Sequence, residues 1–455
     1  MGQIRSINPF DGALLKEFQE FDHARIDLAL SKAETAFVSW KYKSFREKAG
    51  LMMNCSAYLK AHKTELGKLM TLEMGKPIRE SVAEVEKCAA ICDYYAEKAE
   101  LFLADEMVQS DASRSFISYE PLGCILAVMP WNFPFWQVFR FAVPALMAGN
   151  VGVLKHASNV PQCAVAIEEI FLHSGFPEGV FQTLMIGSSC VEYVISQSAV
   201  KAVTLTGSEK AGSEVASLAG KHLKKSVLEL GGSDPFVVLH DADLERASVF
   251  AVKSRMINTG QSCIAAKRFI VVKEIAEVFT QKMVSEMKKL RSGNPLEEST
   301  EVGTIAREDL VQPLLDQIGK SVSMGAKIAL GGNRPSMKGA FINPTILTNV
   351  KPGMPAYEEE IFGPVAAIIA ADNEEDAIRI ANDSRYGLGG SVWTKDKLRG
   401  EKVARRIESG CVFVNGMVKS DPRLPFGGIK NSGYGRELSG VGIREFVNIK
   451  TIWIG

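Results

Sequence analysis

The sequence predicts an α/β fold with two doubly wound parallel-sheet domains. From residue 120 onward, short apolar runs alternate with helical segments, and a second alternating region starts near residue 233. Alternation of strands and helices is typical of a parallel sheet covered by helices on both faces. The length of 455 residues agrees with this organisation, since one domain usually takes roughly 100–200 residues.

The first hundred residues have a helical pattern. Apolar residues recur there at spacings of three and four, which is one face of a helix: Ile26, Leu30, Ala33, Phe37 and Trp40. The pattern continues to about residue 103 and is interrupted by Gly-Lys-Pro at 75–77, a sequence that breaks helices. We therefore expect a mostly helical N-terminal region.

The strands of the first domain are expected at 124–129, 151–154, 181–186 and 202–205, with a helix at 161–173 among them. In the second domain, residues 268–272 resemble a strand that leads into a helix with one apolar face. That face holds Ile275, Val278, Phe279, Met283, Met287 and Leu290. The boundary falls near residue 230. Residues 446–454 form a single strand pattern that needs a partner elsewhere in the chain or in another subunit.

Composition argues against several classes of partner. Lys plus Arg and Asp plus Glu both number 53, so no overall field favours nucleic acid or an anionic membrane. The apolar runs are shorter than a membrane span and no signal peptide is recognisable. Eight scattered cysteines and only six histidines predict reduced thiols in the cytoplasm and no metal site.

Two residues are candidates for covalent chemistry. Cys263 follows Asn-Thr-Gly-Gln-Ser on a predicted turn, and a thiol there becomes a nucleophile if its proton is removed. Its alternative is a small buried side chain. Glu229 ends an apolar strand, where a buried carboxylate is costly unless it serves as a base with a raised pKa or pairs with a cation.

Two loops that follow strands are candidates for ligand binding. Asn132 lies just past a strand end, where its amide can donate to an oxyanion or simply form a turn. Residues 206–212, Thr-Gly-Ser-Glu-Lys-Ala-Gly, open a helix, a place that suits a phosphate. The GxGxxG, P-loop and GxSxG motifs are absent, so generic patterns give only a weak dinucleotide signal.

Taken together, these segments resemble the aldehyde dehydrogenase family along almost the whole chain. The segments match the family in order and spacing: PWNFP at 130–134, GNVGVLK at 149–155, TGSEKAG at 206–212, LELGG at 228–232, NTGQSC at 258–263, EEIFGPV at 359–365, YGL at 386–388, GCVFVN at 410–415 and PFGGIKNSGYGRE at 425–437.

The resemblance implies a catalytic set. Cys263 would attack the aldehyde carbon, and the resulting oxyanion would be held by the Cys263 backbone N–H and the Asn132 amide. Glu229 would activate water to hydrolyse the thioester, which implies a free acid as the product. A non-catalytic, crystallin-like structural protein is the rival from another class; it predicts decay of this set, yet all its members are present.

The resemblance also implies a nicotinamide cofactor, NADP or NAD. Lys155 would contact the adenosine ribose and Ser208 the pyrophosphate, while Glu360 and Phe362 would contact the nicotinamide side. Ser158 stands where NAD-preferring relatives often carry Glu, so a 2′-phosphate should be admitted. His156 replaces a usual Pro. The other residues expected to bind the cofactor are Pro130, Trp131, Gly187 and Gly207.

The family members that this chain resembles most act on succinate semialdehyde. Arg140 would bind the distal carboxylate together with Ser420, or would instead form an ion pair. Trp136 and Phe426 would line the pocket or pack in the core. Ile257 stands where many such enzymes carry a second Arg, which leaves glutarate semialdehyde or a neutral aldehyde as alternatives.

The resemblance assigns the domains and the assembly. Residues 1–104 and 120–230 would form a Rossmann-like dinucleotide-binding domain and 231–445 the catalytic domain. Residues 105–119 and 446–455 would form a small β element that joins subunits into a homodimer or homotetramer. A nucleic-acid-binding protein with a dinucleotide fold is disfavoured by the neutral composition.

Overall fold

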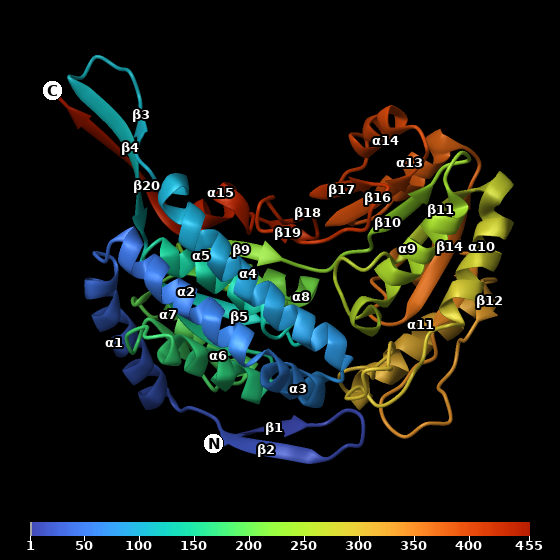
Figure 1. Ribbon diagram of the computed structural model, residues 1–455, viewed down its shortest axis with the longest axis horizontal. Helices are drawn as coiled ribbons and strands as arrows, with labels where there is room; N and C mark the ends of the chain where they lie inside the picture. Colours follow the sequence, from blue (N-terminus) through green and yellow to red (C-terminus); the bar gives the residue numbers. More distant parts are fainter. Residues whose placement is uncertain (1) are drawn as a thin grey trace.

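The computed structural model describes residues 2–455, which form two α/β domains, each on its own sheet (Figure 1). The first sheet has six strands in the order β19-β9-β8-β5-β6-β7. All neighbouring pairs are parallel except β19 with β9. The bounds are β5 Cys124–Met129, β6 Val151–His156, β7 Phe181–Thr183, β8 Val200–Thr206, β9 Lys225–Glu229 and β19 Gly433–Tyr434.

Helices cover both faces of this sheet (Figure 1). The helices that contact its strands are α1 His23–Trp40, α5 Trp136–Met147, α6 Pro161–His173, α7 Val191–Ser196 and α8 Glu209–Lys221. Outside α5 and α6 lie α2 Phe45–Ala61, α3 Lys63–Met74 and α4 Ile78–Phe102. The break predicted at 75–77 is confirmed, since Gly75 ends α3 with φ 77° and Pro77 precedes α4. All twelve residues of α5 are buried, as expected for a helix that is apolar on most sides.

The strand order of the first sheet reverses at β5. The chain builds β6 and β7 on one side of β5 and then returns to build β8 and β9 on the other. In such sheets ligands bind outside the carboxyl ends of the strands at the point of reversal. Here that point lies between the ends of β5 and β8, at Met129 and Thr206.

The second sheet has seven strands in the order β12-β13-β14-β11-β10-β16-β17. Only β12 runs antiparallel to its neighbour. The strands are β10 Pro235–Val238, β11 Arg268–Val272, β12 Lys327–Leu330, β13 Thr345–Thr348, β14 Val365–Ala371, β16 Gly389–Trp393 and β17 Cys411–Val414. The helices are α9 Leu244–Met256, α10 Lys273–Met287, α11 Val311–Ser323, α12 Pro355–Glu358, α13 Glu374–Asn382 and α14 Lys397–Ala404.

Each domain has a hydrophobic core that includes the buried side chains of its own sheet. In the second domain, alternate strand residues face two separate hydrophobic clusters: Val237 and Ile270 belong to one, and Phe236 and Phe269 to the other. This is the period of two that a strand buried on both faces requires. The first domain has one larger cluster that also includes buried residues of α1 to α6.

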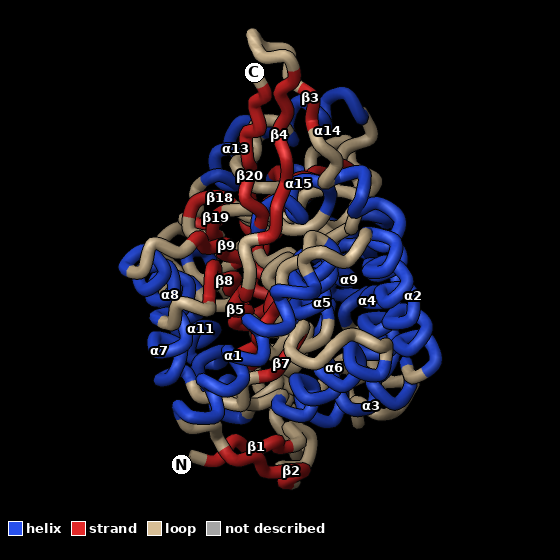
Figure 2. Tube along the Cα trace, turned by 90° about the vertical axis from the view of Figure 1, so that its left-hand side faces the viewer, coloured by secondary structure: helices blue, strands red, loops and turns tan. Residues whose placement is uncertain are grey.

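The helical prediction for the N-terminal region is wrong for its first twenty residues. They form a hairpin of β1 Gln3–Ile7 and β2 Leu14–Gln19, which lies at the end of the molecule opposite the chain's C-terminus (Figures 1 and 2). Burial alternates along β1, with Ile4 and Ser6 inside. Five residues of alternation are too few to outweigh the long helical pattern that follows.

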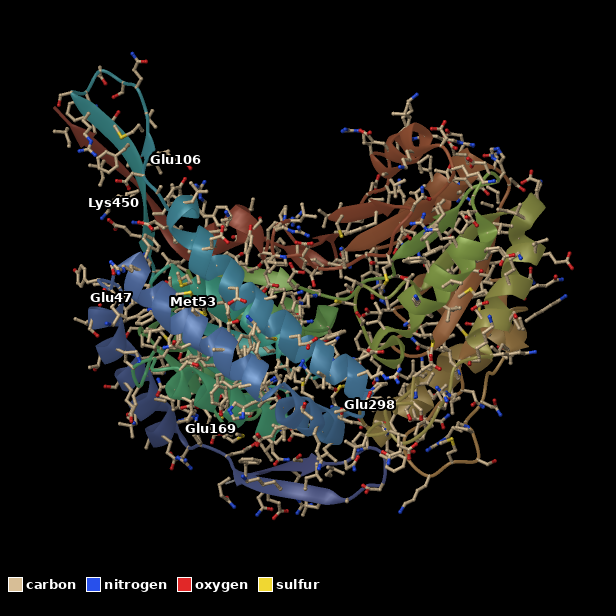
Figure 3. All side chains as sticks on the ribbon, in the orientation of Figure 1. Glu47, Met53, Glu106, Glu169, Glu298 and Lys450 are labelled. Carbon is tan, nitrogen blue, oxygen red and sulfur yellow. The ribbon has the colours of Figure 1, made fainter. Side chains whose placement is uncertain are left out.

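The terminal strand finds its partner within the chain. β20 Val447–Ile454 pairs antiparallel with β4 Arg114–Pro121 over eight positions, and β3 Glu106–Met107 completes a three-stranded arm. The arm projects from the first domain in both views (Figures 1 and 2). Glu106 and Lys450 on it are labelled in Figure 3 and form ion pairs with Arg444 and Glu120.

The chain returns to the first domain before residue 445, the expected end of the second. β19 pairs with β9, and Phe426, Leu438 and Ile443 belong to the hydrophobic core of the first domain. Short pairs such as β15 Tyr386–Gly387 with β18 Ile429–Lys430 accompany this return, and α15 Ser439–Gly442 follows it. The return places residues 425–437 against the carboxyl end of β9.

Within residues 2–455, no helix combines the length and the apolar character that crossing a membrane requires.

Candidate active site

The turn that carries Cys263 has a strained backbone. It leaves α9 and passes through Asn258 and Thr259 with φ of 52° and 56°, a region that costs non-glycine residues about 1–3 kcal/mol each. Gly260 follows with φ 78°, and a Cβ there would lie 2.2 Å from the Gly363 carbonyl oxygen. The turn therefore needs support from the residues around it.

Buried side chains supply that support. The Arg255 Nη1 donates to the Ala266 carbonyl at 3.0 Å. The Gln261 amide donates to the Thr304 carbonyl at 3.1 Å and accepts from the Ala306 N–H at 2.9 Å. Glu80 on α4 accepts from the Asn258 N–H at 2.7 Å. Arg255, Gln261 and Glu80 therefore hold the turn in place.

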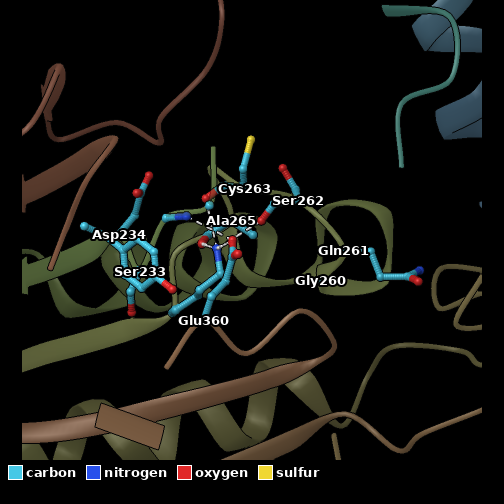
Figure 4. A network of polar contacts seen from close by, with 12 residues as sticks. Ser233, Asp234, Gly260, Gln261, Ser262, Cys263, Ala265 and Glu360 are labelled. Carbon is cyan, nitrogen blue, oxygen red and sulfur yellow. Dashed lines mark hydrogen bonds and ion pairs between the residues drawn. The ribbon is translucent and has the colours of Figure 1, made fainter. Parts of the chain in front are cut away.

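Lys267 binds the other side of the same turn. Its ammonium donates to the carbonyls of Ser262, Cys263 and Ala265 at 3.0, 2.9 and 3.1 Å and lies 3.5 Å from a Glu360 oxygen. In Figure 4 the Cys263 sulfur points away from this network. The thiol is thus free of the contacts that fix its backbone.

The Cys263 thiol is protonated near neutral pH. Burial raises its pKa to about 12, although the nearby Arg140 and Lys267 cations oppose that shift. Because the thiolate is the reactive form, this cysteine needs a base to remove its proton.

A cavity of about 250 Å³ brings half of the predicted site residues together at the point where the first sheet reverses. It is lined by Pro130, Trp131, Asn132, Thr206, Gly207, Ser208, Leu230, Gly231, Cys263, Glu360 and Phe362. Both the β5 and β8 ends contribute to it, and the second domain supplies the cysteine and the carboxylate.

The groups around this cavity fit a dinucleotide. Ser208 caps the thirteen-residue helix α8, whose N-terminus favours phosphate. A Cβ on Gly231 would lie 2.3 Å from a Glu360 oxygen, and Glu360 also accepts from the Gly232 N–H at 3.0 Å, so this carboxylate is fixed where it can meet a ribose hydroxyl. The rings of Phe362 and Trp131 pack edge to face, with their centres 5.7 Å apart.

Lys155, Ser158 and Gly187 lie outside this cavity, just past or at the carboxyl ends of the neighbouring strands. Lys155 is the penultimate residue of β6, Ser158 is exposed, and Gly187 follows β7. Burial lowers the pKa of Lys155, and Glu20 opposes that shift. His156 is buried, contacts the Pro134 carbonyl at 2.9 Å and has its pKa lowered to about 4, so it stays neutral and ties β6 to the 130–134 loop.

The Asn132 amide is oriented by the turn that carries Cys263. Its Nδ2 donates to the Gln261 carbonyl at 3.2 Å, while the Asn258 amide donates to the Asn132 carbonyl at 2.7 Å. A primary amide has two N–H groups, so one remains to face the cavity. The Cys263 backbone N–H has no acceptor within the described part of the chain. These two donors suit an oxyanion.

Glu229 ends β9 and is 2% exposed. Neither of its carboxylate oxygens has a hydrogen-bond partner among residues 2–455. Burial, reinforced by Glu437, raises its pKa well above the usual range, against the pull of Arg140 and Arg436. A raised pKa makes Glu229 a stronger base than an ordinary carboxylate.

Arg140 on α5 is buried beside Glu229 in an ion pair with Glu437. Its guanidinium also lies 4.7 Å from the centre of the Phe426 ring, and its Nη2 donates to the Thr206 hydroxyl at 3.4 Å. Glu437 therefore balances the charge of Arg140. An ion pair of this kind was the alternative that the sequence analysis gave to substrate binding by Arg140.

A second cavity of about 520 Å³ borders the same 131–136 segment, where Phe133 and Trp136 line it. The Trp136 indole N–H donates to the Ser420 hydroxyl at 3.1 Å. Ile257 lines this cavity too and contributes no charge. Arg423 is exposed and pairs with Asp421 at 2.6 Å.

Three charged residues of the site were missed by the sequence analysis: Lys267, Glu437 and Lys87. Lys267 and Glu437 stand within or beside matching segments, but their contacts are with residues far along the chain. Lys87 lies in the middle of α4 and lines the second cavity. Among residues 2–455 no group of His, Cys, Asp and Glu side chains is arranged to hold a metal ion.

Comparison with known proteins identifies the relatives of this chain. A "Probable succinate-semialdehyde dehydrogenase [NADP(+)]" of Synechocystis is 52% identical over 99% of both chains. A "Succinate-semialdehyde dehydrogenase [NADP(+)]" of Mycobacterium avium is 47% identical over 99% of this chain and 97% of its own. The crystal structure of the Streptococcus pyogenes succinic semialdehyde dehydrogenase with NADP+ superposes with a TM-score of 0.97, at 37% identity over 99% of both chains. The family model described as "Aldehyde dehydrogenase family" matches residues 1–452. The chain belongs to the aldehyde dehydrogenase family.

Proposed function

We propose that this protein oxidises succinate semialdehyde to succinate with NADP or NAD, through a covalent intermediate on Cys263. The observation that carries the proposal is the shared cavity: Cys263, the Asn132 amide and the groups suited to a dinucleotide all line it. The names of the relatives support the substrate and the cofactor.

The first half of the reaction forms the covalent bond. The Cys263 thiol loses its proton to water, and the sulfur bonds to the aldehyde carbon. The carbonyl oxygen becomes an oxyanion, which accepts from the Asn132 amide and the Cys263 backbone N–H. A bound nicotinamide cofactor supplies the acceptor for the hydride that leaves this carbon.

The second half releases the acid. Loss of the hydride leaves a thioester on Cys263. Glu229 takes a proton from water, the hydroxyl oxygen bonds to the acyl carbon, and the carbon–sulfur bond breaks. Cys263 regains its thiol and the carboxylic acid departs. Because a base is present for hydrolysis, the product is a free acid rather than an acyl thioester of a second substrate.

The remaining residues have binding roles in this proposal. The first domain holds the cofactor, with Lys155 and Ser158 at the adenosine ribose and Gly187 and Ser208 beside the phosphates. A neutral Ser158 near the half-buried Lys155 admits a 2′-phosphate, which favours NADP. We place the enzyme in the cytoplasm, where its eight free thiols stay reduced.

The projecting arm is proposed to join subunits of a homodimer or homotetramer. It exposes large apolar side chains, including Ile449, Trp453 and Ile454, and such a surface usually meets a partner.

A panel of aldehydes tests the proposed function. Succinate semialdehyde, glutarate semialdehyde and butanal are each assayed with NADP and with NAD. The expected result is the highest kcat/KM for succinate semialdehyde, NADP preferred over NAD, and succinate formed without coenzyme A. A higher kcat/KM for butanal, or a strict need for coenzyme A, would contradict the proposal.

Asn132→Ala should lower kcat by about 10²–10³-fold, because one oxyanion donor is lost in a buried site. The KM should change far less, since the amide matters most when charge develops on the oxygen. Steady-state kinetics with succinate semialdehyde measures both. Asn431→Ala, at an exposed amide outside the cavity, serves as the control and should behave like the wild type. An Asn132→Ala enzyme with normal kcat would remove the amide from the mechanism.

A further inference from the structure

Lys87 lines the second cavity and contacts two buried side chains, Trp136 and Ser420. Its ammonium lies 3.9 Å from the centre of the Trp136 ring and donates to the Ser420 hydroxyl oxygen at 2.7 Å. Trp136 and Ser420 are 3% and 5% exposed. The three side chains come from α4, α5 and the loop after β17, so the fold itself assembles this group.

The hydrogen bonds of this group leave donors unused. A serine hydroxyl has two acceptor lone pairs and one O–H, and the Ser420 oxygen already accepts from Lys87 and from the Trp136 indole at 3.1 Å. Its own hydrogen therefore remains to donate, as do two of the three ammonium N–H groups. Within residues 2–455, no acceptor takes them. The group is built to receive an anion.

The carboxylates on the cavity wall are Glu84, Glu80 and Glu301, of which Glu301 is exposed to solvent. Glu84 pairs with Lys76 and accepts from the backbone N–H groups of Phe135 and Trp136. Glu80 accepts from the Asn258 N–H, and burial raises its pKa to about 7. A carboxylate that enters the cavity meets Lys87, which has no ion-pair partner among residues 2–455.

Arg79 and Lys253 lie at the exposed rim. Arg79 pairs with Glu298 at 3.2 Å, and both cations are solvated. Among residues 2–455, Lys87 is in no ion pair, unlike Arg140, which is paired with Glu437. The cation available to an incoming anion is therefore Lys87.

We propose that Lys87, aided by the Ser420 hydroxyl, binds the distal carboxylate of the substrate and so determines the preference for an aldehyde acid. The inference rests on the proposed function for the substrate, and it adds a specificity residue on α4. The cavity it faces lies beside Asn132, since Phe133 lines the second cavity and Asn132 lines the one with Cys263.

Replacement of Lys87 should separate charged from uncharged aldehydes. Lys87→Met keeps the length and apolar stem of the side chain but removes its charge. The KM for succinate semialdehyde should rise roughly 10- to 100-fold, the cost of losing a hydrogen bond to a charged group. The kcat/KM for butanal should fall far less. Lys87→Arg should recover part of the lost affinity.

The pH dependence supplies a second readout. Burial and the nearby Arg140 lower the pKa of Lys87 to about 8, although Cys88, Glu84 and Asp421 oppose that shift. The wild-type KM for succinate semialdehyde should therefore rise as the pH passes 8, and this rise should disappear in Lys87→Met. The control is Lys98→Met, on the same helix but with a side chain 40% exposed, which should match the wild type throughout.

Calorimetry measures the direct binding of succinate to the wild type and to Lys87→Met. This measurement tests the role of Lys87 independently of the proposed oxidation reaction. Weaker succinate binding by the variant supports the role of Lys87 even if the aldehyde panel favours butanal, which would refute only the proposed substrate. Equal succinate binding by both proteins would overturn the role of Lys87. Equal losses for butanal and succinate semialdehyde would also overturn it, because they would indicate a structural role.

Discussion

Cys263→Ser should lower the rate of aldehyde oxidation by a factor on the order of 10⁴ or more. Removal of the nucleophile in a covalent mechanism costs at least this much in well-characterised hydrolases. A serine hydroxyl has a far higher pKa than a thiol, and burial already raises the pKa of this thiol to about 12. The neighbouring Lys267 cannot offset that difference. Steady-state formation of the reduced cofactor measures the loss.

The variant should still fold, because the turn is held by backbone and by Arg255, Gln261 and Lys267 rather than by the sulfur. Cys190→Ser is the matched control, since that thiol lies on a short 3₁₀ helix, outside the cavity. Near-normal turnover by Cys263→Ser would exclude this cysteine as the nucleophile.

Glu229→Gln should lower steady-state turnover by roughly 10³–10⁴-fold, the upper part of the range for a general base. Because Glu229 acts in hydrolysis and water takes the thiol proton, the loss falls on hydrolysis, and one equivalent of reduced cofactor should form in a burst. Rapid-mixing absorbance measurements detect such a burst. Glu192→Gln changes an exposed carboxylate and should retain wild-type kinetics.

The raised pKa of Glu229 also sets a pH dependence. The carboxylate acts as a base only when it is deprotonated. Because burial and Glu437 raise its pKa, hydrolysis in the wild type should slow as the pH falls through a value above the ordinary glutamate range. Glu229→Gln should lose this dependence. An unchanged pH profile in the variant would show that another group is the base.

Much of the fold could be predicted because its elements are long and periodic. The helix at 161–173 and the strands at 124–129 and 268–272 have the bounds that the sequence predicted. The hairpin at the N-terminus was missed because its strands are short and half exposed. The sequence analysis did not predict that residues 425–446 pack against the first domain. This segment is rich in glycine, and its pattern does not indicate which part of the chain it contacts.

The chemistry of single motifs was harder to predict than the fold. Cys263, Asn132 and Glu360 line one cavity. All three were predicted from segments that match the family. The surroundings of Arg140 depend on Glu437, which is far away in sequence, so spacing could not reveal their pairing. Lys87 is an ordinary lysine in a helix until the fold sets it on Trp136 and Ser420.

The most direct test of the central claim is to identify the covalent intermediate. Glu229→Gln is mixed with succinate semialdehyde and NADP, quenched in acid after the burst, and digested for peptide mapping by mass spectrometry. The account predicts a succinyl thioester on Cys263 in an amount equal to the reduced cofactor formed. Reduced cofactor without an acyl group on Cys263, or with the acyl group on another cysteine, would contradict it.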